Sequence, residues 1–322
     1  MKIVTMMLTL NSENFFKKGV LDALTRAAMG YDHQLIVVDG GSSDGTLDAI
    51  RQKFGDKSKI IQYTMRNLAA CRNTALLNAP KDADFYCWID SDIIIPENFF
   101  FRLLPLFKDS TVGTAEIRAV LEFDPPRSIV GRYYRELKMN QEKGVKVNGG
   151  GATVCSVMRP ELAKILHFDN RFRRAGEDLD SHWQAVEKGY KTILDLNDPL
   201  AIHVRKPSVI EELKRIKDRG IARALNLLIH KKVIKNRGIS GTLAASVITL
   251  ASWVLFVYGI LAAYPLALLP LVLLLIRQML KLRRFWRIDL AVLGLLLSLF
   301  YLAGFTYGFL KYWLPWLLTK RQ

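Results

Sequence analysis

The stretch that decides the fold is residues 34–46, which read QLIVVDGGSSDGT. An apolar run suited to a strand ends at Asp39, a polar glycine-rich turn follows, and residues 46–54 then carry apolar side chains at helical spacing. The same succession recurs on both sides, with strands predicted at Ile3–Thr9, Gln34–Val38, Lys59–Tyr63 and Asp84–Ile89 and helices at Phe15–Ala28, Thr46–Phe54 and Leu68–Asn78. Alternating strands and helices predict an α/β domain with a mainly parallel sheet.

The turn after Asp39 differs from two familiar phosphate loops. A dinucleotide fingerprint needs glycines at positions i, i+2 and i+5, but Ser42 occupies the second of these positions. A P-loop needs a lysine directly after Gly45, where Thr46 stands. Ser42 and Asp44 are therefore interpreted as turn and capping residues. Because ligands of doubly wound sheets bind beyond the carboxyl ends of the strands, Asp39 stands where a ligand is expected.

A second strand end carries two carboxylates. Residues 85–92 read FYCWIDSD, so an apolar strand runs directly into Asp90 and Asp92, which share one face of an extended chain. Two like charges held together are costly unless hydrogen-bond donors or a cation compensate them, and a hard divalent ion bridged by phosphate oxygens does this well. The alternative is a pair of loop carboxylates ahead of the turn at Pro96.

Six motifs in unbroken order resemble those of the inverting family 2 glycosyltransferases of the GT-A fold. They are TLN at 9–11, VVDGGSSDGT at 37–46, CRN at 71–73, DSD at 90–92, GGA at 150–152 and GED at 176–178, the last followed by GYK at 189–191. The resemblance covers about residues 1–205. It implies a Rossmann-like nucleotide-diphospho-sugar transferase domain that uses a nucleotide-sugar donor.

The resemblance also implies roles for donor-side residues. Thr9 and Asp39 match the group that reads the nucleotide base, Arg72 matches a donor-binding arginine, and Asp90 matches the carboxylate near the ribose. The implied cofactor is Mg²⁺ or Mn²⁺, which neutralises charge on the leaving diphosphate. Its expected ligands are Asp92 and Asp90, with His203 as a further candidate that could equally be a core or surface histidine.

On the acceptor side, the resemblance assigns the general base to Asp178. This carboxylate would take a proton from an acceptor hydroxyl as the oxygen attacks the anomeric carbon, inverting its configuration. Gly150, Gly151, Glu177 and Trp183 are expected near the acceptor, although helix packing accounts for Trp183 as well. Because a phosphate acceptor is already ionised, the Glu177-Asp178 pair favours a hydroxyl acceptor over a polyprenyl (dolichyl) phosphate. The Gln-x-x-Arg-Trp motif of processive synthases is missing, which disfavours processive synthesis. Residues 283–286 read RRFW and resemble that motif only superficially.

The C-terminal third carries the apolar excess of the 322-residue chain. No ionisable acid or base occurs in residues 239–276 or in residues 290–310. A bilayer core takes about 20 helical residues to cross, so these runs predict about three membrane helices, at 243–263, 266–280 and 290–310. Tyr312, Trp313 and Trp316 are expected to be interfacial anchors.

The net charge of +16 is concentrated beside these apolar runs. Residues 206–237 hold ten Lys and Arg against three acids, and residues 277–287 hold five with no acid. This clustering indicates an anionic membrane surface and the positive-inside signal, and argues against nucleic acid. Ser208–His230 is predicted to be an amphipathic helix, either at the membrane interface or docked on the catalytic domain. The chain is thus expected to divide into a catalytic domain at 1–205, a basic amphipathic segment at 206–238 and a transmembrane region at 239–322.

These observations predict a membrane-bound, metal-dependent inverting glycosyltransferase. A strand at the very N-terminus with no apolar leader places the catalytic domain on the cytoplasmic face of an integral membrane protein. The expected acceptor is a hydroxyl of a lipid-linked saccharide or glycolipid. The alternatives are a polyprenyl-phosphate glycosyltransferase, a non-catalytic nucleotide-sugar-binding scaffold, and a transporter, for which uncharged helix cores form a poor conduit.

Overall fold

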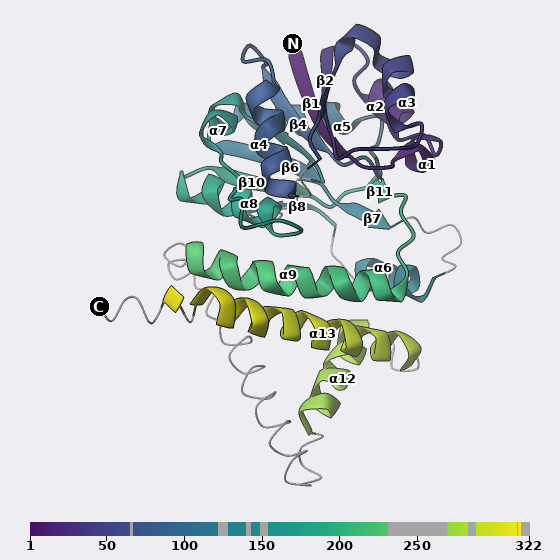
Figure 1. Cartoon of the computed structure of the whole chain (residues 1–322), viewed down its shortest axis with the longest axis vertical. Coiled ribbons are helices and arrows are strands. Elements are labelled where there is room, and N and C mark those ends of the chain that lie inside the picture. Colours follow the sequence, from purple (N-terminus) through teal and green to yellow (C-terminus); the bar gives the residue numbers. More distant parts are fainter. Residues whose placement is uncertain are drawn as a thin grey trace. The chain divides into compact units, whose positions relative to one another are not determined.

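The computed structural model describes residues 1–64, 67–121, 128–139, 143–148, 154–230, 269–282, 288–313 and 315–316. The chain forms two compact units (Figure 1). We call Met1–Glu122 with Glu142–Arg205 the α/β unit, and Phe123–Gln141 with Lys206–Gln322 the helical unit. The division after Arg205 coincides with the predicted end of the catalytic domain. The segment Phe123–Gln141, which the sequence placed in that domain, belongs to the helical unit.

The larger sheet of the α/β unit has eight strands among the described residues. Their spatial order is β3 (Ser58–Gln62), β2 (Asp32–Asp39), β1 (Lys2–Thr9), β4 (Phe85–Ile89), β9 (Cys155–Met158), β6 (Val112–Ile117), β10 (Lys191–Asp195) and β8 (Val145–Val147). The first four are parallel, β9 is antiparallel to both its neighbours, and β10 is parallel to β6 but antiparallel to β8. The predicted α/β class and mainly parallel sheet are confirmed.

A second, three-stranded sheet lies next to the DSD segment. Its central strand β11 (Ala201–His203) pairs antiparallel with β5 (Ile93–Ile94) and parallel with β7 (Ala119–Leu121). The register sets His203 opposite Ile93. Because Ile93 directly follows Asp92, this small sheet brings a histidine from late in the chain to the carboxylates at the end of β4.

The helices of the α/β unit follow the predicted order with one break. Those beside the site are α1 (Glu13–Phe16), α2 (Val20–Ala27), α3 (Thr46–Phe54), α4 (Leu68–Asn78) and α8 (Glu177–Glu187); 3₁₀ turn η1 (Gly55–Lys57), α5 (Phe99–Leu103), 3₁₀ turn η2 (Leu104–Lys108) and α7 (Pro160–Ile165) complete them. The bounds of α3 and α4 are those predicted. The helix predicted over Phe15–Ala28 is interrupted because Gly19 has φ +96°, a left-handed conformation that ends one helix and allows the next to start in a new direction.

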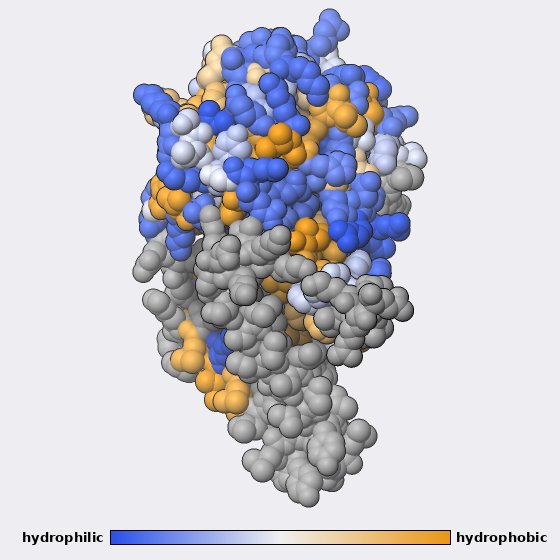
Figure 2. Space-filling view, turned by 90° about the vertical axis from the view of Figure 1, so that its left-hand side faces the viewer, coloured by the Kyte–Doolittle hydropathy of each residue, from blue (hydrophilic) through white to orange (hydrophobic). Residues whose placement is uncertain are grey.

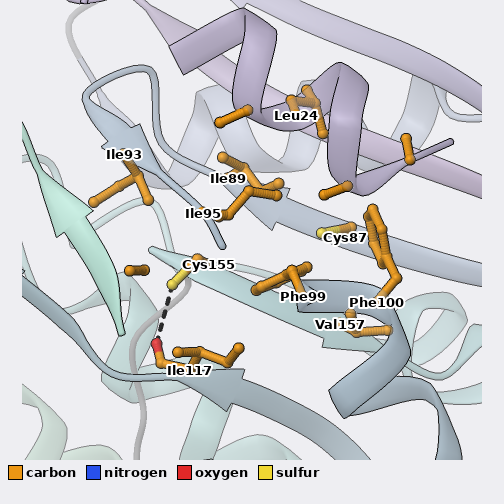
Figure 3. Packing of buried hydrophobic residues seen from close by; sticks show 14 of the residues in the cluster. Leu24, Cys87, Ile89, Ile93, Ile95, Phe99, Phe100, Ile117, Cys155 and Val157 are labelled. Atoms are coloured by element: carbon orange, nitrogen blue, oxygen red, sulfur yellow. Dashed lines mark hydrogen bonds between the residues drawn. The ribbon is translucent and has the colours of Figure 1, made fainter. Parts of the chain in front are cut away.

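Aromatic and aliphatic side chains from several elements fill the core of the α/β unit (Figure 3). Leu24 of α2 and Phe99 and Phe100 of α5 are fully buried, as is Cys87 of β4. Burying a leucine or phenylalanine side chain away from water contributes about 1.5–3 kcal/mol to folding. The thiol of Cys155 donates a hydrogen bond to the carbonyl oxygen of Ile117, at 3.0 Å. Cys71, Cys87 and Cys155, the three cysteines of the chain, form no disulfide bond.

The helical unit contains α6 (Ile129–Met139), α9 (Val209–Ile229), α12 (Leu269–Leu282) and α13 (Ile288–Gly308), which continues as the π-helical turn η4 (Phe309–Trp313). A capping box starts α9. The hydroxyl of Ser208 accepts from the Glu211 amide at 3.2 Å, and the Glu211 carboxylate accepts from the Ser208 amide at 2.8 Å. The helix predicted over Ser208–His230 is therefore present with its ends in place.

Two buried polar side chains tie the helices of this unit together. Glu212 of α9 accepts hydrogen bonds from the Tyr134 hydroxyl at 2.5 Å and from Arg215 at 2.6 Å. Gln278 of α12 accepts from the Tyr133 hydroxyl at 3.2 Å and donates to Ser298 of α13 at 2.7 Å. Both Glu212 and Gln278 are fully buried. Because a buried polar group is costly without partners, these bonds specify how α6 packs with the other helices.

Part of the predicted membrane region can be compared with the structure. The span expected at 243–263 and residues 266–268 of the next lie outside the described residues, whereas α12 and α13 occupy most of the other two. Within the described part of the chain, one helix, Asp289–Trp313, is long and apolar enough to cross a bilayer.

Candidate active site

Hydrogen bonds join the loops that follow three neighbouring strands, β2, β1 and β4. The hydroxyl of Ser12, after β1, donates to Ser91 of the DSD segment at 2.8 Å, and the Ser12 amide donates to Thr46 at 2.7 Å. The Asn11 amide donates to the Ser42 hydroxyl at 2.9 Å, while Asn11 itself takes a left-handed conformation with φ +51°. The polar turns at these strand ends are thus organised as one structure.

Asp39 organises the loop between β2 and α3. Its carboxylate accepts from the Thr9 hydroxyl at 3.0 Å, from the Gly41 and Ser42 amides at 2.9 and 2.8 Å, and from the Ser42 hydroxyl at 2.5 Å. The side chain is fully buried. Gly41 has φ +94°, which only glycine adopts readily. Thr9 and Asp39 therefore meet as expected, and in this structure both oxygens of Asp39 are engaged by the loop itself.

Ser42 and Asp44 behave as the sequence predicted. The Asp44 carboxylate accepts from the Thr46 amide at 3.1 Å and hydroxyl at 2.5 Å, and from the Glu13 amide at 3.2 Å. These are turn and helix-entry bonds, so Asp44 holds the start of α3 against α1.

Arg72 lies at the centre of the site. It comes from α4, which Asn67 caps by accepting from the Ala70 amide at 3.2 Å, and it is 4% exposed. Its Nε donates to Glu177 at 3.2 Å, its Nη2 lies 3.5 Å from Asp90, and its guanidinium stacks 4.8 Å from the Trp88 ring centroid. The side chain is held on three sides by β4 and by the start of α8.

The Arg72 ion pairs leave two buried atoms without hydrogen bonds. Within the described structure, Arg72 Nη1 and Glu177 Oε2 have no partner. Burial raises the pKa of Asp90 to about 7; Arg72 opposes this shift, and the charges of Asp92, Glu177 and Asp178 add to it. Burial and Asp178 also raise the pKa of Glu177, against the effect of Arg72. A cluster with more carboxylates than cations and an unsatisfied guanidinium nitrogen is suited to a ligand that brings both phosphate and a cation.

Asp92 and His203 form the second half of the site. His203 Nδ1 lies 3.4 Å from Asp92, and Arg205 Nε lies 3.7 Å from the same oxygen. Burial opposes ionisation of Asp92, but His203 and Arg205 hold its pKa below the usual range. The described residues contain no group of three or more His, Cys, Asp or Glu side chains able to hold a metal. A carboxylate and an imidazole still fit Mg²⁺ or Mn²⁺, which take their remaining ligands from phosphates and water.

Asp178 occupies the first turn of α8. Gly176 precedes the helix with φ +94°, and Glu177, Asp178 and Asp180 all lie in the first turn, where the helix dipole favours negative charge. The Asp178 carboxylate accepts from the Leu179 amide at 2.7 Å. It is half-buried, and its charge acts on both Arg72 and Asp90, so it belongs to the same cluster.

Other predicted acceptor residues have mixed outcomes. Trp183 is 6% exposed and packs against His182, with ring centroids 5.1 Å apart, in keeping with helix packing. Glu177 is buried and pairs with Arg72, and its expected place on the acceptor side stays a prediction. Gly150 and Gly151 lie outside the described residues. The pairing of Arg72 with Glu177 and Trp88 was not predicted, because it joins residues as many as 105 positions apart.

Comparison with known proteins identifies the family. The model for "Glycosyl transferase family 2" matches residues 5–165, half of the chain. No curated protein matches the sequence. Solved structures with the same fold include the mannosyltransferase PcManGT of Pyrobaculum calidifontis in complex with GDP-Man and Mn²⁺. The TM-score is 0.54 at 17% identity, over 93% of this chain and 86% of that one.

Two bacterial structures are also similar. Residues 1–349 of S. aureus TarS in complex with UDP-GlcNAc align with a TM-score of 0.50 at 17% identity, covering 71% of this chain and 67% of that one. Glucosyl-3-phosphoglycerate synthase of Mycobacterium tuberculosis gives 0.49 at 16% identity, covering 71% and 79%. The chain spans between 38% and 67% of the length of the TarS structures that it matches. The motif order, the sheet and the family match together show that the chain belongs to glycosyl transferase family 2 and has the GT-A fold.

Proposed function

We propose that this protein moves a sugar from a nucleotide-sugar donor to a hydroxyl of a membrane-associated acceptor, with inversion and with the help of a divalent cation. One observation carries the proposal: the buried Arg72 and Glu177 meet the partly exposed Asp90 beside Asp178, and Asp92 with His203 adjoins them through the DSD segment. Such a set suits a donor whose diphosphate departs as the leaving group and an acceptor whose hydroxyl attacks.

The donor diphosphate is proposed to bind at Arg72. Arg72 Nη1 is buried and has no hydrogen-bond partner in the described structure, so a phosphate oxygen would supply one. The loop organised by Asp39 and Thr9 would border the nucleotide base. Two proteins of the same fold, PcManGT and TarS, are described in complex with GDP-Man and UDP-GlcNAc, which supports a nucleotide-sugar donor in general terms.

Asp92 and His203 are the residues that would hold the cation. When bound, Mg²⁺ or Mn²⁺ would neutralise the charge that grows on the departing nucleoside diphosphate. The protein's part is to keep Asp92 ionised, and the hydrogen bond and charge of His203 do this by lowering its pKa. PcManGT is described with Mn²⁺, which is consistent with this use of the site.

Asp178 is proposed as the general base. It is half-buried, it is held at the start of α8 by the Leu179 amide, and it lies within the charge cluster. A neutral hydroxyl must lose its proton as it attacks the anomeric carbon, and a positioned carboxylate accepts that proton. The C-terminal helices and the basic charge beside them support an acceptor at a membrane, with the catalytic domain on the cytoplasmic face.

Asp178→Asn tests the proposal. We expect turnover to fall by about 10²-fold or more while donor binding survives, as for loss of a general base. Glu187→Gln, at the exposed end of the same helix, is the matched control and should behave like the wild type. Turnover is measured as nucleoside diphosphate released in the presence of membrane lipid extract. Unchanged turnover in Asp178→Asn would reject the hydroxyl acceptor and support a polyprenyl phosphate.

A further inference from the structure

Helices α9 and α13 pack so closely that their backbones touch. A Cβ atom at Gly304 would lie 2.0 Å from the carbonyl oxygen of Lys217, and one at Gly220 would lie 2.1 Å from the carbonyl oxygen of Tyr301. At Gly308 the corresponding distance, to the carbonyl oxygen of Ile221, is 2.8 Å. Figure 1 shows the two ribbons side by side along their lengths. Only glycine fits at such an approach, so the pairing is specific and not adjustable by rotamer changes.

The two helices run in the same direction. Gly304 contacts Lys217, and one turn later Gly308 contacts Ile221, so residue numbers increase together on both sides. The pair continues past the end of α13, where the Trp313 indole donates a hydrogen bond of 2.8 Å to the carbonyl oxygen of Ala224. Whatever orientation α13 takes in a membrane, α9 must therefore share it.

The pair of helices could either cross the bilayer or lie in the plane of its surface, and the charges of α9 decide between these two orientations. The part of α9 that faces the glycines of α13 carries ionisable side chains at Lys214, Arg215, Lys217, Asp218, Arg219 and Arg223. Lys214, Lys217 and Arg219 are exposed. If α13 crossed the bilayer, these groups would lie in hydrocarbon, which is costly for charged side chains. A helix pair in the plane of the surface keeps them among the head groups.

The outer face of α13 shows what would cover it. Val292, Leu296, Phe300 and Tyr307 of α13 and Leu310 of the turn η4 that continues it are all at least 39% exposed, and their spacing places them along one side of the helix. On α12, Val272, Leu273, Ile276 and Leu280 are at least 44% exposed. Hydrophobic residues, drawn in orange, also gather at the lower left of Figure 2. The upper part of the view is mainly hydrophilic, with scattered apolar residues. Apolar stripes of this extent need a cover other than water.

We propose that α13 lies in the plane of one leaflet, paired with α9, and that its apolar stripe is buried in the acyl region of a bilayer with anionic head groups. The charge beside the stripe identifies this partner, because residues 277–287, which begin within α12 and end just before α13, hold five basic residues and no acid. The proposal deepens the membrane-associated function proposed above. It replaces the span expected at 290–310 with an interfacial helix, which leaves both ends of α13 on the side of α9.

Depth measurements on α13 test the proposal without any catalytic readout. Val292→Cys, Phe300→Cys and Leu310→Cys, in a chain carrying Cys71→Ser, place a nitroxide at the start, middle and end of the exposed stripe. The chain is reconstituted into vesicles of phosphatidylcholine and phosphatidylglycerol, and electron paramagnetic resonance compares access by oxygen and by a water-soluble nickel complex. In-plane binding gives three similar, shallow depths.

Two other results would overturn the proposal. The labelled positions Val292 and Leu310 are 18 residues apart, or about 27 Å along a helix, which is close to the thickness of the hydrocarbon core. A spanning helix would therefore place Phe300 deepest, with the other two labels near opposite surfaces. Labels that are all open to the nickel complex would show that the stripe does not meet lipid. Neither result depends on whether the chain transfers a sugar, so failure here leaves the proposed function to its own test.

Discussion

Arg72 is a buried cation whose charge is matched by carboxylates from distant parts of the chain. Glu177 lies 3.2 Å from Nε, and Asp90 lies 3.5 Å from Nη2. The motif order predicted that Arg72 and Asp90 belong to one site, because both stand near the same edge of the sheet. It did not predict Glu177 as the partner, because adjacency to Asp178 along the chain suggested the acceptor side. Side-chain direction at the first turn of a helix depends on packing, which no motif spacing encodes.

Arg72→Met separates the structural from the ligand-binding role of Arg72. Leaving Glu177 buried and uncompensated is expected to cost about 3 kcal/mol of stability, and Arg72→Met/Glu177→Leu should recover most of it. Binding of a nucleoside diphosphate with Mn²⁺, measured by calorimetry, should be lost in both variants. Recovery of stability together with wild-type binding in the double variant would show that Arg72 serves the fold alone.

His33 gives the α/β unit a dependence on pH. Its Nε2 lies 2.8 Å from the Thr5 hydroxyl, between β1 and β2, and burial lowers its pKa to about 4. The unfolded chain binds the proton below about pH 6.5, so stability is fully present above that pH and is lost as pH falls toward 4. The loss amounts to about 3 kcal/mol at most.

His33→Gln is expected to remove this part of the acid sensitivity, since glutamine does not titrate. The midpoints of thermal unfolding of the wild type and of His33→Gln should converge as pH is lowered from 7.5 to 4.5. An equal decline of both proteins with pH would show that His33 does not cause the acid sensitivity.

At the scale of elements, local signals predicted helices well where a cap or a turn defines the ends. The bounds of α3 and α4 are those predicted, and α9 has its capping box at Ser208. The exception is the pair α1 and α2, which apolar spacing joined into one helix. The spacing is compatible with both arrangements, and the left-handed backbone of Gly19 decides between them. Strand β11 was not predicted, because three residues carry too little periodicity.

The connection from β10 to β11 depends on Arg102 of α5. Arg102 donates to the buried Asp195 carboxylate at 2.6 and 3.1 Å, and to the carbonyl oxygens of Asn197 and Pro199 at 2.8 and 2.6 Å. This contact fixes the segment that leads into His203. Arg102→Ala is expected to destabilise the chain by about 3–5 kcal/mol, because it leaves Asp195 buried without its cation.

Adding Asp195→Asn to Arg102→Ala should recover part of that loss, as followed by thermal unfolding. Arg26→Ala, which removes an exposed ion pair to Glu97, is the control and should change stability by less than about 1 kcal/mol. A loss equal to that of the control would show that Arg102 does not hold the connection.

For the whole molecule, the α/β unit ends at Arg205, the residue where the sequence predicts the end of a catalytic domain, but the sequence did not predict that a helix from the middle of this region joins the helical unit. The boundary at Arg205 follows from the change in charge and hydropathy. Helix α6 carries no such change; it joins the helical unit through Tyr133 and Tyr134, whose partners Gln278 and Glu212 come much later in the chain. An apolar run of membrane length likewise does not distinguish a span from an in-plane helix, and the backbone contact of α13 with the charged α9 makes that distinction.

The central claim is that the cluster around Arg72, Asp92 and Asp178 transfers a sugar from a nucleotide-sugar donor. The most direct test incubates the purified full chain with membrane lipid extract, Mn²⁺ and, in turn, UDP-, GDP- and dTDP-sugars, and measures release of the nucleoside diphosphate. We predict release with at least one donor and its loss in Asp92→Asn or with EDTA present. Binding of a donor without any release would contradict the claim and identify a scaffold, and full activity in EDTA would contradict the role given to the cation.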